Sequence, residues 1–197
     1  MPAPWDVAPI PEQGDRDATD IYAAKGRAVS MWEVMEVSLS RLYAIFTGQP
    51  RFSRAAYQQY GEPLSFKARL DGLQRVAGSY FVGKPNQEGE AEFEDLVERA
   101  RQFAMRRNEI THSWVQPVAF DRQHETLSDG SHRWTTTYWF FLVPPLYTSR
   151  KFDPNERPEF MYTSREIDMY AGHFADLEVD AVRLAVVLEH PQLRSLL

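Results

Sequence analysis

The chain has 197 residues, a formal net charge of −6 and no cysteine, and 43% of its residues are hydrophobic. This length and composition predict one folded domain with its own core and exclude a disordered chain. Without cysteine there are no disulfides, thiolate metal sites or cysteine nucleophiles, and the acidic balance argues against coating nucleic acid through bulk charge.

No apolar run approaches the about 18 residues of a transmembrane helix. The first twenty residues lack the basic and apolar regions of a secretory signal. We therefore expect a cytoplasmic protein without membrane contact.

Residues 1–19 form a proline-rich segment, with four prolines among the first eleven residues. Such a segment is expected to be an extended arm without helix or strand. Its Trp5 either docks on the body or a partner, or belongs to a free tail. Residues 20–197 are predicted to form the single domain.

Amphipathic helical spacing is predicted over residues 20–46, 52–60 and 65–81. Gly48 and Pro50 end the first of these helices. A fourth helix opens with acidic residues at 90–95, which suit the positive end of a helix dipole. Its stripe repeats every three or four residues, and one member is an arginine: Phe93, Leu96, Ala100, Phe103, Arg107, Ile110 and Trp114.

The period then changes to two, and residues 115–143 predict a β-hairpin whose tight turn is Asp129-Gly130. Pro144-Pro145 ends it, an irregular segment follows, and residues 160–163 could add a short strand. A last helix is predicted over 164–189, with Thr163 and Glu166 in capping-box spacing. The predicted fold class is mainly α, an up-and-down helical bundle with a hairpin insertion at about 115–163 before the last helix.

The fourth helix ends in "RRNEITHSW", residues 106–114, a group of side chains able to bind phosphate and transfer a proton. Arg107 occupies a position that neighbouring turns give to apolar residues, so it needs a counter-charge, a partner or an anion. Positions five apart on a helix differ by about 140°, so Arg107 and His112 do not share a face. Two helices related by a two-fold axis could bring both into one cleft. Arg183 and His190 match the same loose spacing, but in an ordinary helix.

The segment Arg107 to His112, "RNEITH", resembles the motif of the HEPN domain family: helical bundles that commonly dimerise and carry arginine and histidine four to six residues apart near the end of a late helix. The resemblance covers about residues 20–114 and 164–190; the arm and residues 115–163 have no counterpart. It implies a homodimer and a metal-independent endoribonuclease that cleaves single-stranded RNA through the 2′-hydroxyl, which DNA lacks.

The resemblance assigns catalytic roles to three residues. His112 would move the proton, Arg107 would stabilise the phosphate charge, and Asn108 would orient one of them. The predicted substrate-binding residues are Arg106, which would bind a flanking phosphate, Glu109, which would hold an arginine or the histidine, and Trp114. Family members act as toxins or in phage defence, and any antitoxin would be a separate protein.

Three alternatives stay open from the sequence. Arg107 could pair with an acid and His112 cap the helix, in a catalytically silent interaction or ligand-binding module. Arginines at 99, 101, 106 and 107 either complement the helix dipole or form a track for RNA. The aromatic strand 134–141 is either buried or stacks on bases. The five histidines share no zinc-type spacing, so neither a metal site nor a cofactor is expected.

Overall fold

The computed structural model describes residues 2–50, 52–145, 147 and 158–196. Five α-helices are present in these ranges: α1 (Ala18–Phe46), α2 (Arg54–Gly61), α3 (Phe66–Gly83), α4 (Gln87–His112) and α5 (Ser164–Glu189). Strands β1 (Trp114–Thr126) and β2 (His132–Val143) lie between α4 and α5, and a short 3₁₀ helix, η1 (Pro191–Leu196), follows α5. The prediction of a mainly helical chain with a hairpin before the last helix is confirmed.

Local signals place the helix starts. Side chains of Asp17, Ser53, Ser65 and Asn86 each accept a backbone N–H at the first turn of α1 to α4, as N-caps do. The predicted capping box is present at α5, where the Thr163 backbone N–H donates to the Glu166 carboxylate at 2.8 Å. The fourth helix begins at Gln87, three residues before the expected start, because Asn86 caps it.

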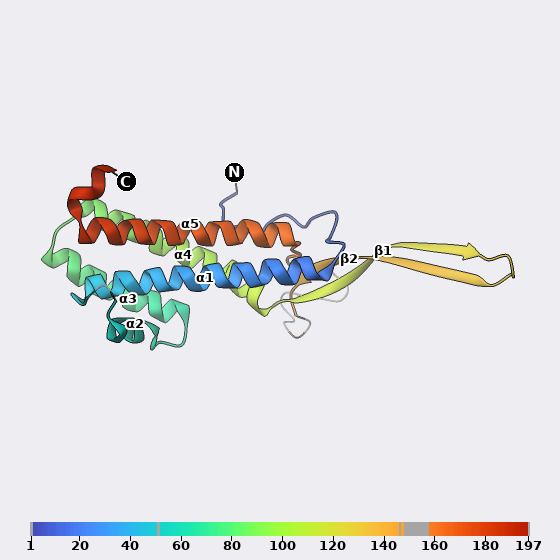
Figure 1. Cartoon of the computed structure of the whole chain (residues 1–197), viewed down its shortest axis with the longest axis horizontal. Helices are drawn as coiled ribbons and strands as arrows, with labels where there is room; N and C mark the ends of the chain where they lie inside the picture. Colours follow the sequence, from blue (N-terminus) through green and yellow to red (C-terminus); the bar gives the residue numbers. More distant parts are fainter. Residues whose placement is uncertain (1, 51, 146, 148–157, 197) are drawn as a thin grey trace.

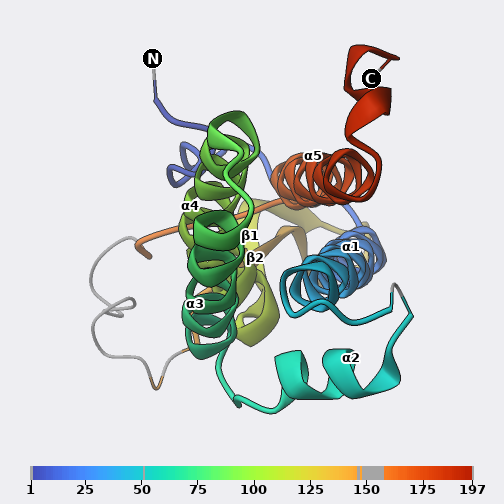
Figure 2. The same ribbon diagram turned by 90° about the vertical axis from the view of Figure 1, so that its left-hand side faces the viewer.

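The four long helices α1, α3, α4 and α5 enclose the core, and α2 packs outside α1 and α3 (Figures 1 and 2). Trp32 lies fully buried at the centre, with its ring 4.7 Å from Phe66 of α3 and 5.1 Å from Phe174 of α5. Trp5 of the N-terminal arm docks on this core through an edge contact with Phe103 of α4, at 5.9 Å.

The helix directions correct one part of the prediction. Ion pairs join Arg27 to Asp168 and Arg41 to Glu189, so α1 and α5 run parallel. Phe66 at the start of α3 contacts the middle of α1, and Tyr80 near its end contacts Phe46, so α3 runs the same way. Of these four long helices, only α4 runs in the direction opposite to α1. The helices therefore do not alternate up and down in chain order, because α2 connects α1 to α3 in a way that leaves those two parallel.

The hairpin pairs Trp114 with Val143 and continues to Thr126 with His132, with a bulge between Ala119 and Asp121. Gly130 has φ of 81° in the turn, a conformation that favours glycine. Figure 1 shows the hairpin leaving one end of the bundle and projecting far beyond it. In place of the single expected short strand, Tyr162 forms an isolated bridge to Leu142.

Within the described residues, none of the helices combines the length and the hydropathy needed to cross a membrane.

Candidate functional site

Arg106 and Glu109 form a buried ion pair one turn before the end of α4. The Arg106 Nη1 lies 3.1 Å from the Glu109 carboxylate, and the two side chains are 7% and 5% exposed. The Tyr162 hydroxyl donates to the same carboxylate at 2.7 Å and accepts from Arg106 at 3.4 Å. Burial, and then the Glu109 charge, raise the pKa of Tyr162 far above its ordinary value.

This cluster shows how Arg106 is held. Its side chain is largely buried and paired with Glu109, yet it lines the groove described below, so its contact with a flanking phosphate stays a prediction. Glu109 holds an arginine in place, as predicted. The arginine that is buried on the apolar side of α4 is therefore Arg106, and Glu109, one turn later on the same helix, supplies its counter-charge.

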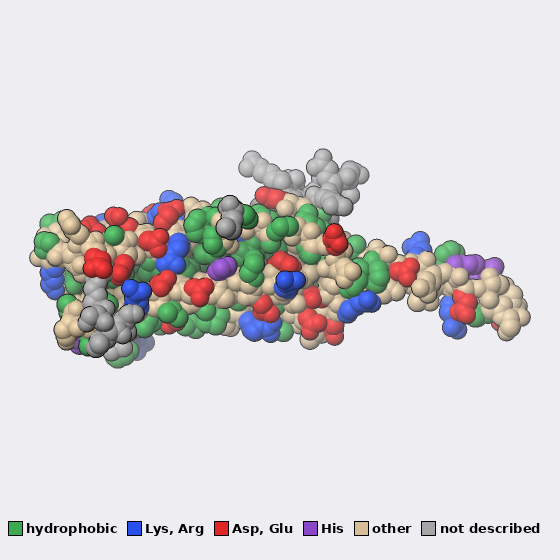
Figure 3. Space-filling model, turned by 90° about the horizontal axis from the view of Figure 1, so that it is seen from above, with side chains coloured by type: hydrophobic (Ala, Val, Ile, Leu, Met, Phe, Trp, Pro, Cys, Tyr) green, Lys and Arg blue, Asp and Glu red, His purple; other side chains and the backbone are tan. Residues whose placement is uncertain are grey.

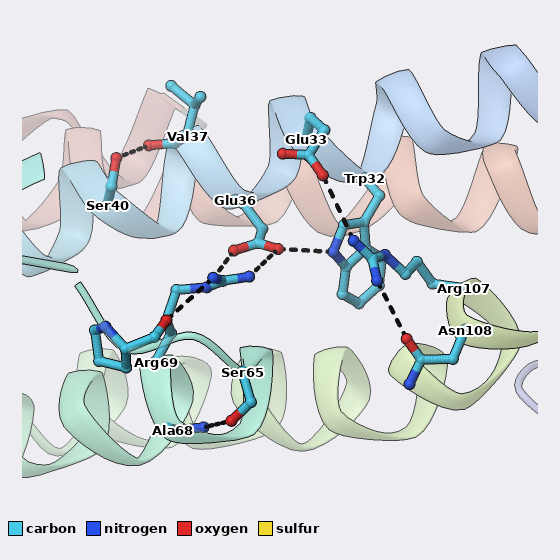
Figure 4. Close-up of polar contacts among 11 residues, drawn as sticks. Trp32, Glu33, Glu36, Val37, Ser40, Ser65, Ala68, Arg69, Arg107 and Asn108 are labelled. Carbon is cyan, nitrogen blue, oxygen red and sulfur yellow. Dashed lines mark hydrogen bonds and ion pairs between the residues drawn. The ribbon is translucent and has the colours of Figure 1, made fainter. Parts of the chain in front are cut away.

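Arg107 points to the other side of α4, toward α1 (Figure 4). Its guanidinium carbon lies 5.9 Å from the centre of the Trp32 ring, a cation–π contact. Its Nη1 donates to the Asn108 side-chain oxygen at 3.2 Å, and its Nη2 lies 3.6 Å from Glu33. The Nε atom is buried and has no hydrogen-bond partner among the described residues. Arg107 is thus 23% exposed and only partly satisfied.

A hydrogen-bonded layer fixes the surface on which Arg107 rests. The Glu36 carboxylate accepts from the Trp32 indole N–H at 2.9 Å and from Arg69 of α3 at 2.9 Å. Figure 4 shows this layer between α1 and α3, beside the Arg107 guanidinium. The Trp32 ring is therefore held in place from its indole N–H, and the Arg107 guanidinium packs against it.

His112 lies at the end of α4 and is exposed. It lines a groove of about 590 Å³ that runs between α4 and the chain that follows the hairpin. Asn108, one turn earlier, lines the same groove, and its other walls include Met105, Pro144, Tyr147 and Phe160. The groove therefore offers an imidazole and an amide above a largely apolar floor.

Within one chain the structure brings Asn108 next to each of the other two predicted catalytic residues, but it does not bring those two together. Asn108 bonds Arg107 and shares the groove with His112. Arg107 itself turns toward α1, as the 140° separation on the helix requires. In this conformation Arg107 and His112 therefore face different neighbours, Arg107 toward α1 and His112 toward the groove.

Trp114 was predicted to end the stripe of the fourth helix and is instead the first residue of β1, because Ser113 is extended with ψ of 164°. Its ring is 41% exposed, and its N–H donates to the Pro144 carbonyl at 3.3 Å. It closes the base of the hairpin and does not line the groove.

Lys25 is a neighbour of the site that sequence reasoning missed. Its ammonium donates to the Ser113 carbonyl at 2.8 Å, directly after His112, and burial lowers its pKa. Nothing in the pattern of α1 marks Lys25, because it meets the end of α4 only through the packing of the two helices. A cation at a helix C-terminus also stabilises the helix dipole.

The other arginines of α4 do not form a free basic track. Arg99 contacts Asp95 and Asp180, both at 2.7 Å, and Arg101 contacts Glu98 at 2.9 Å. In the part of the chain that the structure covers, no three histidine, aspartate or glutamate side chains gather as metal ligands.

Comparison of the chain with protein-family models, with curated proteins and with solved structures found no match.

Proposed function

We propose that the protein is a metal-independent endoribonuclease of HEPN type that cleaves single-stranded RNA, with His112, Arg107 and Asn108 as its catalytic residues. The observation that carries the proposal is the end of α4: an exposed histidine and an amide share one groove, and the amide is bonded to Arg107, whose side chain is 23% exposed. An arginine so placed is able to bind an anion without first breaking a strong ion pair, since its contact with Glu33 is 3.6 Å long.

The proposed active form is a homodimer in which the ends of two α4 helices face each other. The groove of one chain then receives the Arg107 guanidinium of the other, which removes the geometric conflict between Arg107 and His112. Arg106 and Glu109, fixed by Tyr162, keep the last turn of α4 rigid. Both residues also line the groove, so they form part of its wall.

In the proposed step, a ribose 2′-oxygen attacks the adjacent phosphorus, and its proton passes to a neutral His112. The bond from phosphorus to the 5′-oxygen breaks, that oxygen takes a proton from water, and His112 then returns its proton to the solvent. The products are a 2′,3′-cyclic phosphate and a 5′-hydroxyl. Arg107 stabilises the extra negative charge of the pentacoordinate phosphate, and Asn108 orients the arginine.

The biological setting that goes with this activity is a cytoplasmic toxin or phage-defence ribonuclease. Such an enzyme needs restraint, so its regulator would be a separate protein that blocks the groove or the dimer.

The test is cleavage of a mixed-sequence single-stranded RNA by the purified protein in EDTA, with analysis of the product ends. We expect cyclic phosphate ends, and losses of about 10²–10⁴-fold in rate for both His112→Ala and Arg107→Ala. Arg183→Ala and His190→Ala are matched controls, because this pair has the same loose spacing but lies elsewhere. Arg183 is exposed and meets Glu92 at 3.7 Å, so its loss should leave cleavage unchanged.

The proposal would be contradicted if both site variants still cleaved RNA. It would also be contradicted if the two control variants lost as much activity as the site variants. Circular dichroism and light scattering on each variant separate a lost catalytic group from a lost fold or dimer.

One observation favours a second candidate function, an interaction module without catalysis. The projecting hairpin exposes large aromatic side chains: Phe120 at 42%, Trp134 at 63% and Tyr138 at 45%. The aromatic strand 134–141 is thus exposed at Trp134 and Tyr138 and buried only toward its end, at Phe141. Exposed aromatic side chains are a common feature of binding surfaces. Absence of any cleavage by a folded dimer, together with binding of a partner through the hairpin, would favour this function over the ribonuclease.

A further inference from the structure

The outer part of the hairpin carries a pair of histidines that the proposed ribonuclease does not use. His124 lies on β1 and His132 on β2, and both are exposed. In Figure 3 the histidine side chains of the projecting hairpin lie together near its tip, well away from the bundle. The two histidines are eight residues apart in the sequence, and the pairing of β1 with β2 brings them together.

The register explains why the two imidazoles meet. His124 pairs with Trp134, and His132 pairs with Thr126, so the two histidines are diagonal neighbours on one face of the hairpin. The His124 Nε2 lies 3.0 Å from the His132 Nδ1, and the rings are within 29° of parallel. This contact is a hydrogen bond in which one ring donates its N–H to the other, so a metal ion bound by both nitrogens would take the place of that proton.

We propose that His124 and His132 form a bidentate site for a divalent late transition metal ion, with Cu²⁺ preferred over Zn²⁺. Two nitrogens at about 2.0–2.1 Å from one metal, 3.0 Å apart, subtend an angle of about 94°. That angle suits neighbouring positions of the tetragonal geometry that Cu²⁺ adopts. A tetrahedral Zn²⁺ would need the nitrogens about 3.3 Å apart. Imidazole is a good ligand for both, and the Irving–Williams order independently favours copper.

The neighbours of the pair are a hydroxyl and an aromatic ring. Thr126 Oγ1 lies 3.3 Å from the His132 Nδ1, and the Trp134 ring rests 4.5 Å from the His124 ring, which restricts the imidazole. On the same face Arg122 is the nearest charged neighbour along β1, whereas Glu125 and Arg133 pair on the opposite face. Because these strands bring no carboxylate to the face, water would complete the coordination.

The test adds Cu²⁺ or Zn²⁺ alone to the full chain and follows binding by calorimetry, with electron paramagnetic resonance for copper. We expect one Cu²⁺ per chain, a spectrum showing two imidazole nitrogen ligands, and weaker Zn²⁺ binding. Because the second imidazole binds as an intramolecular ligand, His124→Ala and His132→Ala should each weaken Cu²⁺ binding on the order of 100-fold. Protons compete for the same nitrogens, so binding should weaken on acidification.

His112→Ala and His190→Ala are the controls, because these histidines lie in and near the bundle, and each should bind Cu²⁺ like the unaltered chain. The proposal is overturned if no Cu²⁺ binds at micromolar concentration, if the two hairpin variants retain the unaltered affinity, or if a control variant loses it. None of these results depends on ribonuclease activity, which is measured in EDTA.

Discussion

Arg106 and Arg107 are adjacent in sequence, yet α4 places them in different environments. Arg106 is neutralised inside the fold by Glu109 and the Tyr162 hydroxyl. Arg107 rests on the Trp32 ring with one buried N–H unpaired. If Arg106 left Glu109, a charge would remain buried without a partner. Arg107, which lies over an aromatic ring, can replace its weak contact with Glu33 by a contact with a phosphate. Arg106 is therefore fixed by its ion pair, and Arg107 is the arginine that we propose as catalytic.

Tyr162 gives this cluster a distinct pH dependence. Its pKa is raised in the folded chain, so the unfolded state releases the phenol proton first as pH rises above about 10. Above this pH the unfolded state binds fewer protons than the folded state, so the free energy of unfolding falls as pH rises. The contribution of Tyr162 to stability is therefore complete below pH 10.

Tyr162→Phe removes this dependence together with the hydrogen bond to Glu109. We expect the variant to be less stable at pH 8, and its deficit to shrink above pH 10 by up to about 1.4 kcal/mol per pH unit. Urea unfolding of both proteins from pH 8 to 11 measures the difference between their free energies of unfolding. The other titrating groups are the same in both proteins, so they cancel in this difference. A deficit that stays constant across that range would show that the phenol does not titrate late in the folded state.

At the scale of elements, the hairpin has two distinct halves. Its inner half is tied to the body: Asp15 bridges to Phe140, Tyr162 bridges to Leu142, and residues 141–143 are buried. Its outer half is exposed on most of its residues. A two-stranded hairpin is marginally stable in water, and its outer half therefore contributes little to the bundle.

Replacing residues 121–137 by Asn-Gly tests this division. We expect unchanged helical content and a melting temperature within about 3 °C of the full chain, since each kcal/mol shifts it by about 2–4 °C at this size. The same change should abolish Cu²⁺ binding, because both histidines are removed. A large loss of thermal stability would mean that the outer half is part of the folding unit.

Across the whole molecule, the sequence could predict what depends on local periodicity and turn chemistry. The helices, the hairpin with its Asp129-Gly130 turn and the capping box at Thr163 are of this kind. It could not predict what depends on packing. The stripe on α4 did not reveal that Arg106 rather than Arg107 is buried, nor that Lys25 meets Ser113, because adjacent helical positions differ by only about 100° and the neighbours decide which is covered.

The proposed site likewise belongs to the whole assembly rather than to one helix. One chain separates Arg107 from His112, and a two-fold dimer would unite them. An active enzyme therefore should not require both residues to be intact on the same chain.

The most direct measurement is to mix the inactive Arg107→Ala and His112→Ala proteins, allow subunits to exchange, and assay RNA cleavage in EDTA. Half the dimers would then be mixed, each with one intact pair of Arg107 and His112, so cleavage should recover to about a quarter of the unaltered level. Each variant alone, at the same total concentration, is the control. If the subunits exchange and the unaltered protein cleaves RNA, but the mixture stays inactive, a shared site between the two chains is contradicted.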